Sequence, residues 1–157
     1  MKGLWSVEIA KPPEKIWPFL IEPGKVLQWY SFLQKFEYTG EQRGVDAPLY
    51  FEERASGQTL KLNCMVTELV QNKRFAFKMN SGTMMKSYEE SWSVEAIPAG
   101  SRFTLMYQGE LRYGILGKLI GALGQSSSNA HVKEILSKLK SLAEVQKLFL
   151  VGGRDHG

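Results

Sequence analysis

Glu90 is the residue whose neighbours most favour chemistry, because it alternates with Tyr88 and Trp92. Alternate residues of a strand share one face of a sheet, so this spacing places a carboxyl among aromatic side chains. Burial there raises the pKa of a carboxyl and lets it act as a general acid or base on a carbonyl compound. Glu90 is therefore the candidate catalytic residue. The structural alternative is that it reaches water or an arginine such as Arg54 or Arg112.

Tyr107 and Glu53 follow the same kind of alternation. Tyr107 alternates with Phe103, and Glu53 follows Phe51 two positions along the chain. A tyrosine has an apolar ring and a polar tip, so Tyr88 and Tyr107 could both orient the oxygen of a ligand. Glu53 is a further carboxyl expected on the interior face.

Aromatic side chains supply most of the expected interior. Core packing explains many of them, but a sheet folded around one helix often fills incompletely. An aromatic-lined space with few polar groups suits a hydrophobic small molecule. The candidate ligand-binding residues are Tyr88, Trp92, Phe103, Tyr107, Phe51, Phe75, Phe77, Trp29, Leu119 and Leu123.

Metal, nucleophile and cofactor sites lack support in the sequence. His131 and His156 are far apart, and neither has nearby nitrogen or sulfur donors, so we expect no metal. Cys64 alternates with Leu62 and Val66, as is typical of a small buried residue rather than a reactive thiol. The glycines form no phosphate-binding loop, and we expect no cofactor.

Composition limits the class of protein. The chain has 157 residues, of which 43% are hydrophobic and 23% charged, and these values indicate one globular domain rather than a disordered or coiled-coil chain. We expect a single domain over residues 1–149 and a flexible tail over residues 150–157. The formal net charge is +4, but lysines and arginines alternate with acids, so we expect no nucleic-acid partner.

The location of the protein is also constrained by sequence. Charged side chains interrupt the first residues at Glu8, Lys11, Glu14 and Lys15, which is unlike a signal peptide. The apolar stretch 115–123 is too short to span a membrane and contains Lys118. With a single cysteine, the sequence predicts a cytoplasmic protein that is not integral to a membrane. Whether it forms a homodimer stays open.

Hydrophobic periodicity predicts the elements that must position these residues. A strand over residues 4–10 precedes two short helices, which begin at Pro12 and Gly24, and the second extends to about Leu33. A period of two then predicts antiparallel strands with the following ranges: 47–54, 59–69, 74–80, 84–97 and 102–113. A period of 3.6 predicts a long C-terminal helix over about residues 114–148.

This order resembles the START and birch-allergen-like superfamily, also called SRPBCC, which includes polyketide cyclase/dehydrase-like proteins. Residues 11–20 and 24–29 resemble its opening helices, residues 90–105 its late hairpin, and residues 114–121 and 136–144 its closing helix. The resemblance implies an α+β helix-grip fold. A curved antiparallel sheet of about six to seven strands would wrap around a long C-terminal helix, with two short helices after the first strand.

The resemblance also implies an internal cavity and hence a function. The first hypothesis is a protein that binds a hydrophobic small molecule, either lipid-like or aromatic. The alternative is an enzyme, a polyketide cyclase, aromatase or dehydratase that uses Glu90 as its cavity carboxyl. A third class is an interaction partner within a larger complex, for which a large exposed apolar patch would be the mark.

Overall fold

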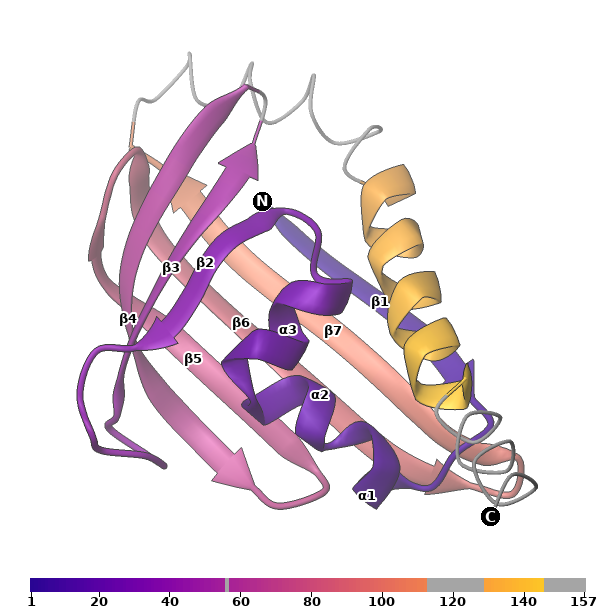
Figure 1. Ribbon diagram of the computed structural model, residues 1–157. Helices are drawn as coiled ribbons and strands as arrows, with labels where there is room; N and C mark the ends of the chain where they lie inside the picture. Colours follow the sequence, from indigo (N-terminus) through magenta and orange to yellow (C-terminus); the bar gives the residue numbers. More distant parts are fainter. Residues whose placement is uncertain (56, 113–128, 146–157) are drawn as a thin grey trace.

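Seven antiparallel strands form a single curled sheet in which the first strand pairs with the last (Figure 1). The structure is a computed structural model and describes residues 1–55, 57–112 and 129–145. The strand order is β1-β7-β6-β5-β4-β3-β2, so consecutive strands from β2 to β7 are neighbours. The elements are β1 (Lys2–Ile9), α1 (Pro13–Ile16), α2 (Pro18–Ile21), α3 (Pro23–Trp29), β2 (Leu33–Tyr38), β3 (Pro48–Ala55), β4 (Gln58–Val70), β5 (Arg74–Gly82), β6 (Met85–Ile97) and β7 (Gly100–Leu111).

Alternation of side chains gives the sheet one buried and one exposed face. In β4 the buried residues Leu60, Leu62, Cys64 and Val66 alternate with more exposed ones. Burial of these apolar side chains supplies the main driving force for the sheet. The predicted antiparallel sheet and its helix-grip arrangement are confirmed.

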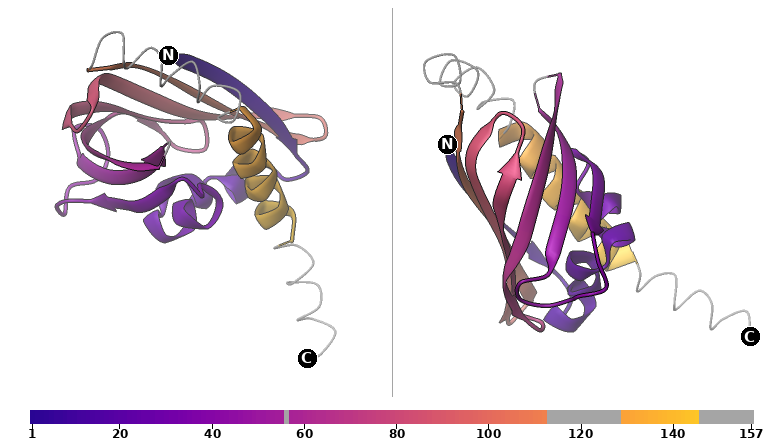
Figure 2. Two further views of the ribbon diagram at one scale, coloured as in Figure 1. Left: turned by 90° about the horizontal axis from the view of Figure 1, so that it is seen from above. Right: turned by 90° about the vertical axis from the view of Figure 1, so that its left-hand side faces the viewer.

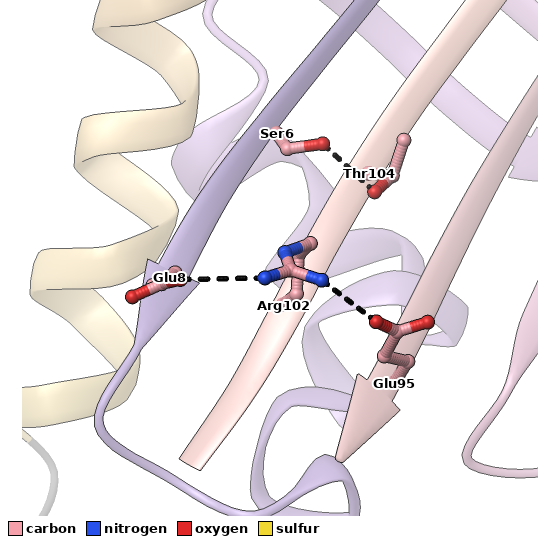
Figure 3. Close-up of polar contacts among 5 residues, drawn as sticks. All are labelled: Ser6, Glu8, Glu95, Arg102 and Thr104. Carbon is pink, nitrogen blue, oxygen red and sulfur yellow. Dashed lines mark hydrogen bonds and ion pairs between the residues drawn. The ribbon is translucent and has the colours of Figure 1, made fainter. Parts of the chain in front are cut away.

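The outer face joins β1, β7 and β6 through polar side chains (Figure 3). Ser6 Oγ and Thr104 Oγ1 lie 2.9 Å apart, and Arg102 lies between Glu8 at 3.5 Å and Glu95 at 2.8 Å. Exposed ion pairs of this kind contribute about 0 to 1 kcal/mol each. These polar contacts are consistent with the strand register, but burial of apolar side chains on the inner face supplies most of the stability.

Prolines set the boundaries of the short helices. Pro13, Pro18 and Pro23 lie at the starts of α1, α2 and α3. A backbone N–H in the first turn of a helix has no carbonyl partner within the helix, so a proline, which lacks this N–H, is tolerated there. The predicted first helix is therefore divided at Pro18 into two four-residue helices. The three helices together take the place expected for two.

The predicted end of the second helix at Leu33 is wrong. Helix α3 ends at Trp29, and Tyr30 adopts φ −88° and ψ 78°, which leaves the helical region. Leu33 then begins β2, where it pairs with Glu53 of β3. The apolar spacing of Val26 and Leu33 fits a helix, but strand pairing and burial of Leu33 outweigh it.

The C-terminal helix is described over residues 129–145 and lies on the same concave side as the short helices (Figure 2). Its buried residues follow the expected helical spacing and are Val132, Ile135, Leu136, Leu139 and Ala143. Lys140 Nζ donates to the Glu8 carbonyl at 3.1 Å, and Glu144 accepts from the Ala10 N–H at 2.9 Å. The remainder of the predicted helix and the predicted tail lie outside the described residues. No described helix has the length and apolar character needed to span a bilayer.

Gly100 is required where β6 turns into β7. Its φ is +139°, and a Cβ there would lie 2.3 Å from the Ile9 carbonyl oxygen and 2.7 Å from the Lys11 nitrogen. We expect Gly100→Ala to lower the free energy of unfolding by about 2 kcal/mol or more in urea denaturation. Gly24→Ala is the control, because nothing lies within 4 Å of its added methyl. Equal stability of the two variants would contradict this reading of the turn.

Candidate functional site

Glu90 lies on the inner face of β6 with only 3% of its surface exposed. The Tyr30 and Tyr88 hydroxyls donate to its Oε1, the former at 3.1 Å, and Trp92 Nε1 donates to its Oε2 at 2.6 Å. We call these four residues the Glu90 cluster. Within the part of the chain that the structure describes, no ion pair includes Glu90. A buried carboxyl is thus held by neutral donors alone.

Local structure explains how the Glu90 cluster assembles. Tyr88, Glu90 and Trp92 share one face because they alternate along β6. Tyr30 lies directly after α3, where it is the C-terminal capping residue of the helix. Gly109 of β7 pairs with Tyr88, and a Cβ on Gly109 would lie 3.1 Å from the Tyr88 ring. The missing side chain at residue 109 leaves room for that ring.

Trp92 is the centre of the aromatic core and is fully buried. Its ring centroid lies between 5.3 and 5.9 Å from those of five other rings, namely Trp29, Tyr30, Phe36, Phe75 and Phe77. Offset and edge-on contacts at these separations are favourable beyond the burial of area. The core therefore fixes the position of the indole N–H that binds Glu90.

A second group of rings crosses the inner face from β1 toward β3. Trp5 stacks on Tyr107 at 5.5 Å, Tyr107 stacks on Tyr88 at 6.3 Å, and Tyr88 contacts Phe51 edge-on at 6.1 Å. We call these four rings the aromatic row. Trp5 and Tyr107 are only partly buried, so the row runs from a more accessible end to the Glu90 cluster.

Both interior carboxyls have raised pKa values. Burial raises the pKa of Glu90 to about 7, although its three hydrogen-bond donors oppose the change. Burial and then the charge of Glu90 raise the pKa of Glu53 to about 8. Burial, followed by the Glu90 charge, also holds the pKa of Tyr30 and of Tyr88 well above the ordinary value. The site can therefore hold or release a proton near neutral pH.

The space beside the Glu90 cluster is nearly filled by side chains. The residues around it are Tyr30, Leu33, Phe36, Phe51, Phe77, Glu90 and Trp92. Together they leave a gap too narrow for a water molecule. The internal cavity that the resemblance implies is filled at this place, and a ligand must move a side chain to reach Glu90.

The structure brings most of the predicted site residues together. Tyr88 and Trp92 bind Glu90, and Phe51 and Phe77 line the narrow space. The other described members are nearby in the aromatic core or the aromatic row, as follows: Trp29, Phe75, Phe103 and Tyr107. None of these four lines the narrow space, and Phe103 contacts Trp29 at 5.7 Å. Leu119 and Leu123 lie outside the described residues.

Three residues of the site were not predicted: Tyr30, Leu33 and Phe36. Tyr30 falls within the range predicted for the second helix, and its hydroxyl binds a carboxyl 60 residues further along the chain. The local sequence contains no signal for this contact, because the helix was expected to continue to about Leu33. Phe36 lies before the first of the strand ranges predicted for this part of the chain, 47–54, and was not included among the ligand-binding residues.

Other kinds of site find little support among the described residues. Burial raises the pKa of the Cys64 thiol well above its ordinary value, so this residue is not a thiolate at neutral pH. In residues 1–55, 57–112 and 129–145, no three His, Cys, Asp or Glu side chains are grouped to hold a metal ion.

Comparisons with known proteins agree on the family and fold. Residues 5–144 match the family model described as polyketide cyclase / dehydrase and lipid transport. The protein TTHA0849 from Thermus thermophilus superimposes with a TM-score of 0.78 at 19% identity, covering 93% of this chain and 99% of that one. The Zhui aromatase/cyclase from Streptomyces sp. R1128 gives 0.76 at 12% identity, with 92% and 93% covered.

A START superfamily protein from Mycobacterium smegmatis gives a TM-score of 0.72 at 14% identity, covering 90% of this chain and 98% of that one. At these low sequence identities, the structural similarity shows only that the fold is shared. No curated protein matches the chain.

Proposed function

The chain belongs to the polyketide cyclase/dehydrase and lipid transport family, and from that premise we propose that it binds a hydrophobic small molecule whose polar end reaches the Glu90 cluster. Membership of this family supports a ligand-binding or cyclase role. The more specific proposal, a ligand whose polar end reaches Glu90, rests on the residues of this chain.

The observation that carries the proposal is the buried Glu90 and its three side-chain donors. Burying a carboxyl without a cation is costly, and an apolar residue of similar size would fill the same place more cheaply. Perturbed carboxyls of this kind concentrate at functional sites. The Glu90 cluster is thus best explained as a polar anchor for a ligand.

The aromatic row offers a surface for the apolar body of that ligand. Trp5 and Tyr107 are partly buried and stacked, so a flat or extended apolar molecule can lie against them. Its polar oxygen would then approach Tyr88 and Glu90. A modest rotation of an aromatic side chain would widen the narrow space for it.

Binding can be tested with 2-naphthol, a neutral aromatic compound with one hydroxyl. We expect it to shift the Trp5 and Trp92 indole N–H resonances, and we expect Tyr88→Phe to weaken its binding about tenfold by removing a hydrogen bond. Tyr50→Phe is the matched control, because the Tyr50 hydroxyl donates to Glu52 at 2.6 Å, away from the Glu90 cluster. If neither 2-naphthol nor a fluorescent lipid binds, and the purified protein carries no ligand in native mass spectrometry, the proposal is wrong.

A second candidate function, catalysis, is favoured by the acidity of Glu90. With a pKa of about 7, Glu90 can accept a proton from a carbon beside a carbonyl or donate one to a departing hydroxyl. Tyr88 would hydrogen-bond to the carbonyl oxygen. In a test with a poly-β-ketone thioester, cyclised or dehydrated product should form with the wild type and not with Glu90→Gln. Equal product from both proteins would exclude Glu90 as the catalytic group.

A further inference from the structure

Glu53 is a second carboxyl that faces the same interior as Glu90. It follows Phe51 on the inner face of β3, and Phe51 lies at the end of the aromatic row beside Tyr88. Whereas Glu90 is 3% exposed, Glu53 retains partial exposure. A ligand that lies along the aromatic row therefore meets Glu53 as the more accessible of the two carboxyls.

The two carboxyls have no cationic partner in the described part of the chain. None of the ion pairs there includes Glu53 or Glu90, and Glu53 forms no hydrogen bond with another described side chain. Their influence on one another is electrostatic, since the charge of Glu90 adds to the effect of burial in raising the pKa of Glu53. The polar end of the site is thus acidic, with neutral hydroxyl and indole donors around it.

We propose that this site selects hydrophobic ligands with an uncharged hydroxyl or carbonyl at the polar end and rejects carboxylates, an inference that rests on the proposed function above. Once Glu53 and Glu90 have lost their protons, a bound carboxylate would place a further negative charge beside them in a partly desolvated space, where repulsion is strong. A hydroxyl can donate to either carboxylate, and a carbonyl can accept from either carboxylic acid or from a tyrosine.

Two probes with the same ring system test this selectivity, namely 2-naphthol and 2-naphthoate at pH 8.5, where both Glu53 and Glu90 are mostly ionised. We expect 2-naphthoate to bind about tenfold more weakly or worse, as measured by titration of the indole N–H resonances. Glu53→Gln should reduce this ratio to about threefold or less by improving the binding of 2-naphthoate. The wild-type comparison needs no variant and stands if Glu53→Gln folds poorly.

Glu52→Gln is the matched control, because Glu52 lies next to Glu53 on β3 but alternates to the other face and accepts from Tyr50. It should leave the ratio unchanged. Equal binding of the two probes to the wild type would overturn the selectivity while leaving the proposed function in place. An unchanged ratio in folded Glu53→Gln would overturn the role of Glu53. If neither probe binds, the selectivity is overturned, whereas the proposed function fails only if the fluorescent lipid and native mass spectrometry also show no ligand.

Discussion

The free energy of unfolding is expected to fall by about 6 kcal/mol as the pH rises from 5 to 9, of which Glu90→Gln should remove about 2 to 3 kcal/mol. The pKa of Glu90 is about 7 in the folded protein, against an ordinary value of 4.5. Folding therefore disfavours the ionised form. Stability is highest when Glu90 is protonated, and it decreases as the pH rises from 4.5 through 7. Glu53 acts in the same direction, because its folded pKa is raised to about 8.

Urea denaturation at a series of pH values measures this effect. Glu144 does not contribute within the range, because its pKa is lowered by the hydrogen bond from Lys140, and its stabilisation is lost only as the pH falls below the ordinary value for a glutamate. Glu41→Gln, in an exposed turn, is the control and should keep the wild-type profile. A wild-type stability that is constant or rises from pH 5 to pH 9 would show that the interior carboxyls do not titrate as described.

Trp92→Ala is expected to lower the free energy of unfolding by about 4 kcal/mol. The indole is fully buried, and its removal leaves a large cavity among the five rings that contact it. The substitution also removes the Nε1 donor from Glu90 Oε2. Thermal or urea denaturation at pH 6, where much of Glu90 is protonated, gives the effect of packing with the smallest contribution from charge.

Trp92→Phe separates the two roles of this side chain. A phenyl ring keeps many of the ring contacts but donates no hydrogen bond, so we expect a loss of about 1 to 2 kcal/mol. Because the indole N–H favours the carboxylate form, the pKa of Glu90 should rise further in this variant. A cost below about 1 kcal/mol for Trp92→Ala would contradict the central position of Trp92 in the core.

Much of the fold follows from periodicity in the sequence. Alternation in β4, illustrated by Leu62 and Cys64, predicted the buried face because alternate residues of a strand lie on the same face of a sheet. The division of the first helix at Pro18 has a local cause in the missing backbone donor. The end of α3 could not be predicted in the same way, since the pairing of Leu33 with Glu53 involves residues far apart in the chain.

The candidate site shows the same distinction between local and distant effects. Tyr88, Glu90 and Trp92 were placed together by spacing alone, and Glu53 was placed on the inner face by parity. The Tyr30 hydrogen bond depends on how α3 docks on the concave face, which no local pattern encodes. How completely side chains fill the interior depends on their rotamers around Trp92. The size of the expected cavity therefore could not be predicted from the sequence.

The central claim is that Glu90 is a buried carboxyl that anchors a hydrophobic ligand, and the Trp92 indole N–H resonance reports on it most directly. We would follow this resonance through a pH titration, with and without saturating 2-naphthol, and assign it with Trp92→Phe. The account predicts a midpoint of about 7 in the free protein and a displaced midpoint with the probe bound. A midpoint near 4.5 that is the same with and without 2-naphthol would contradict it.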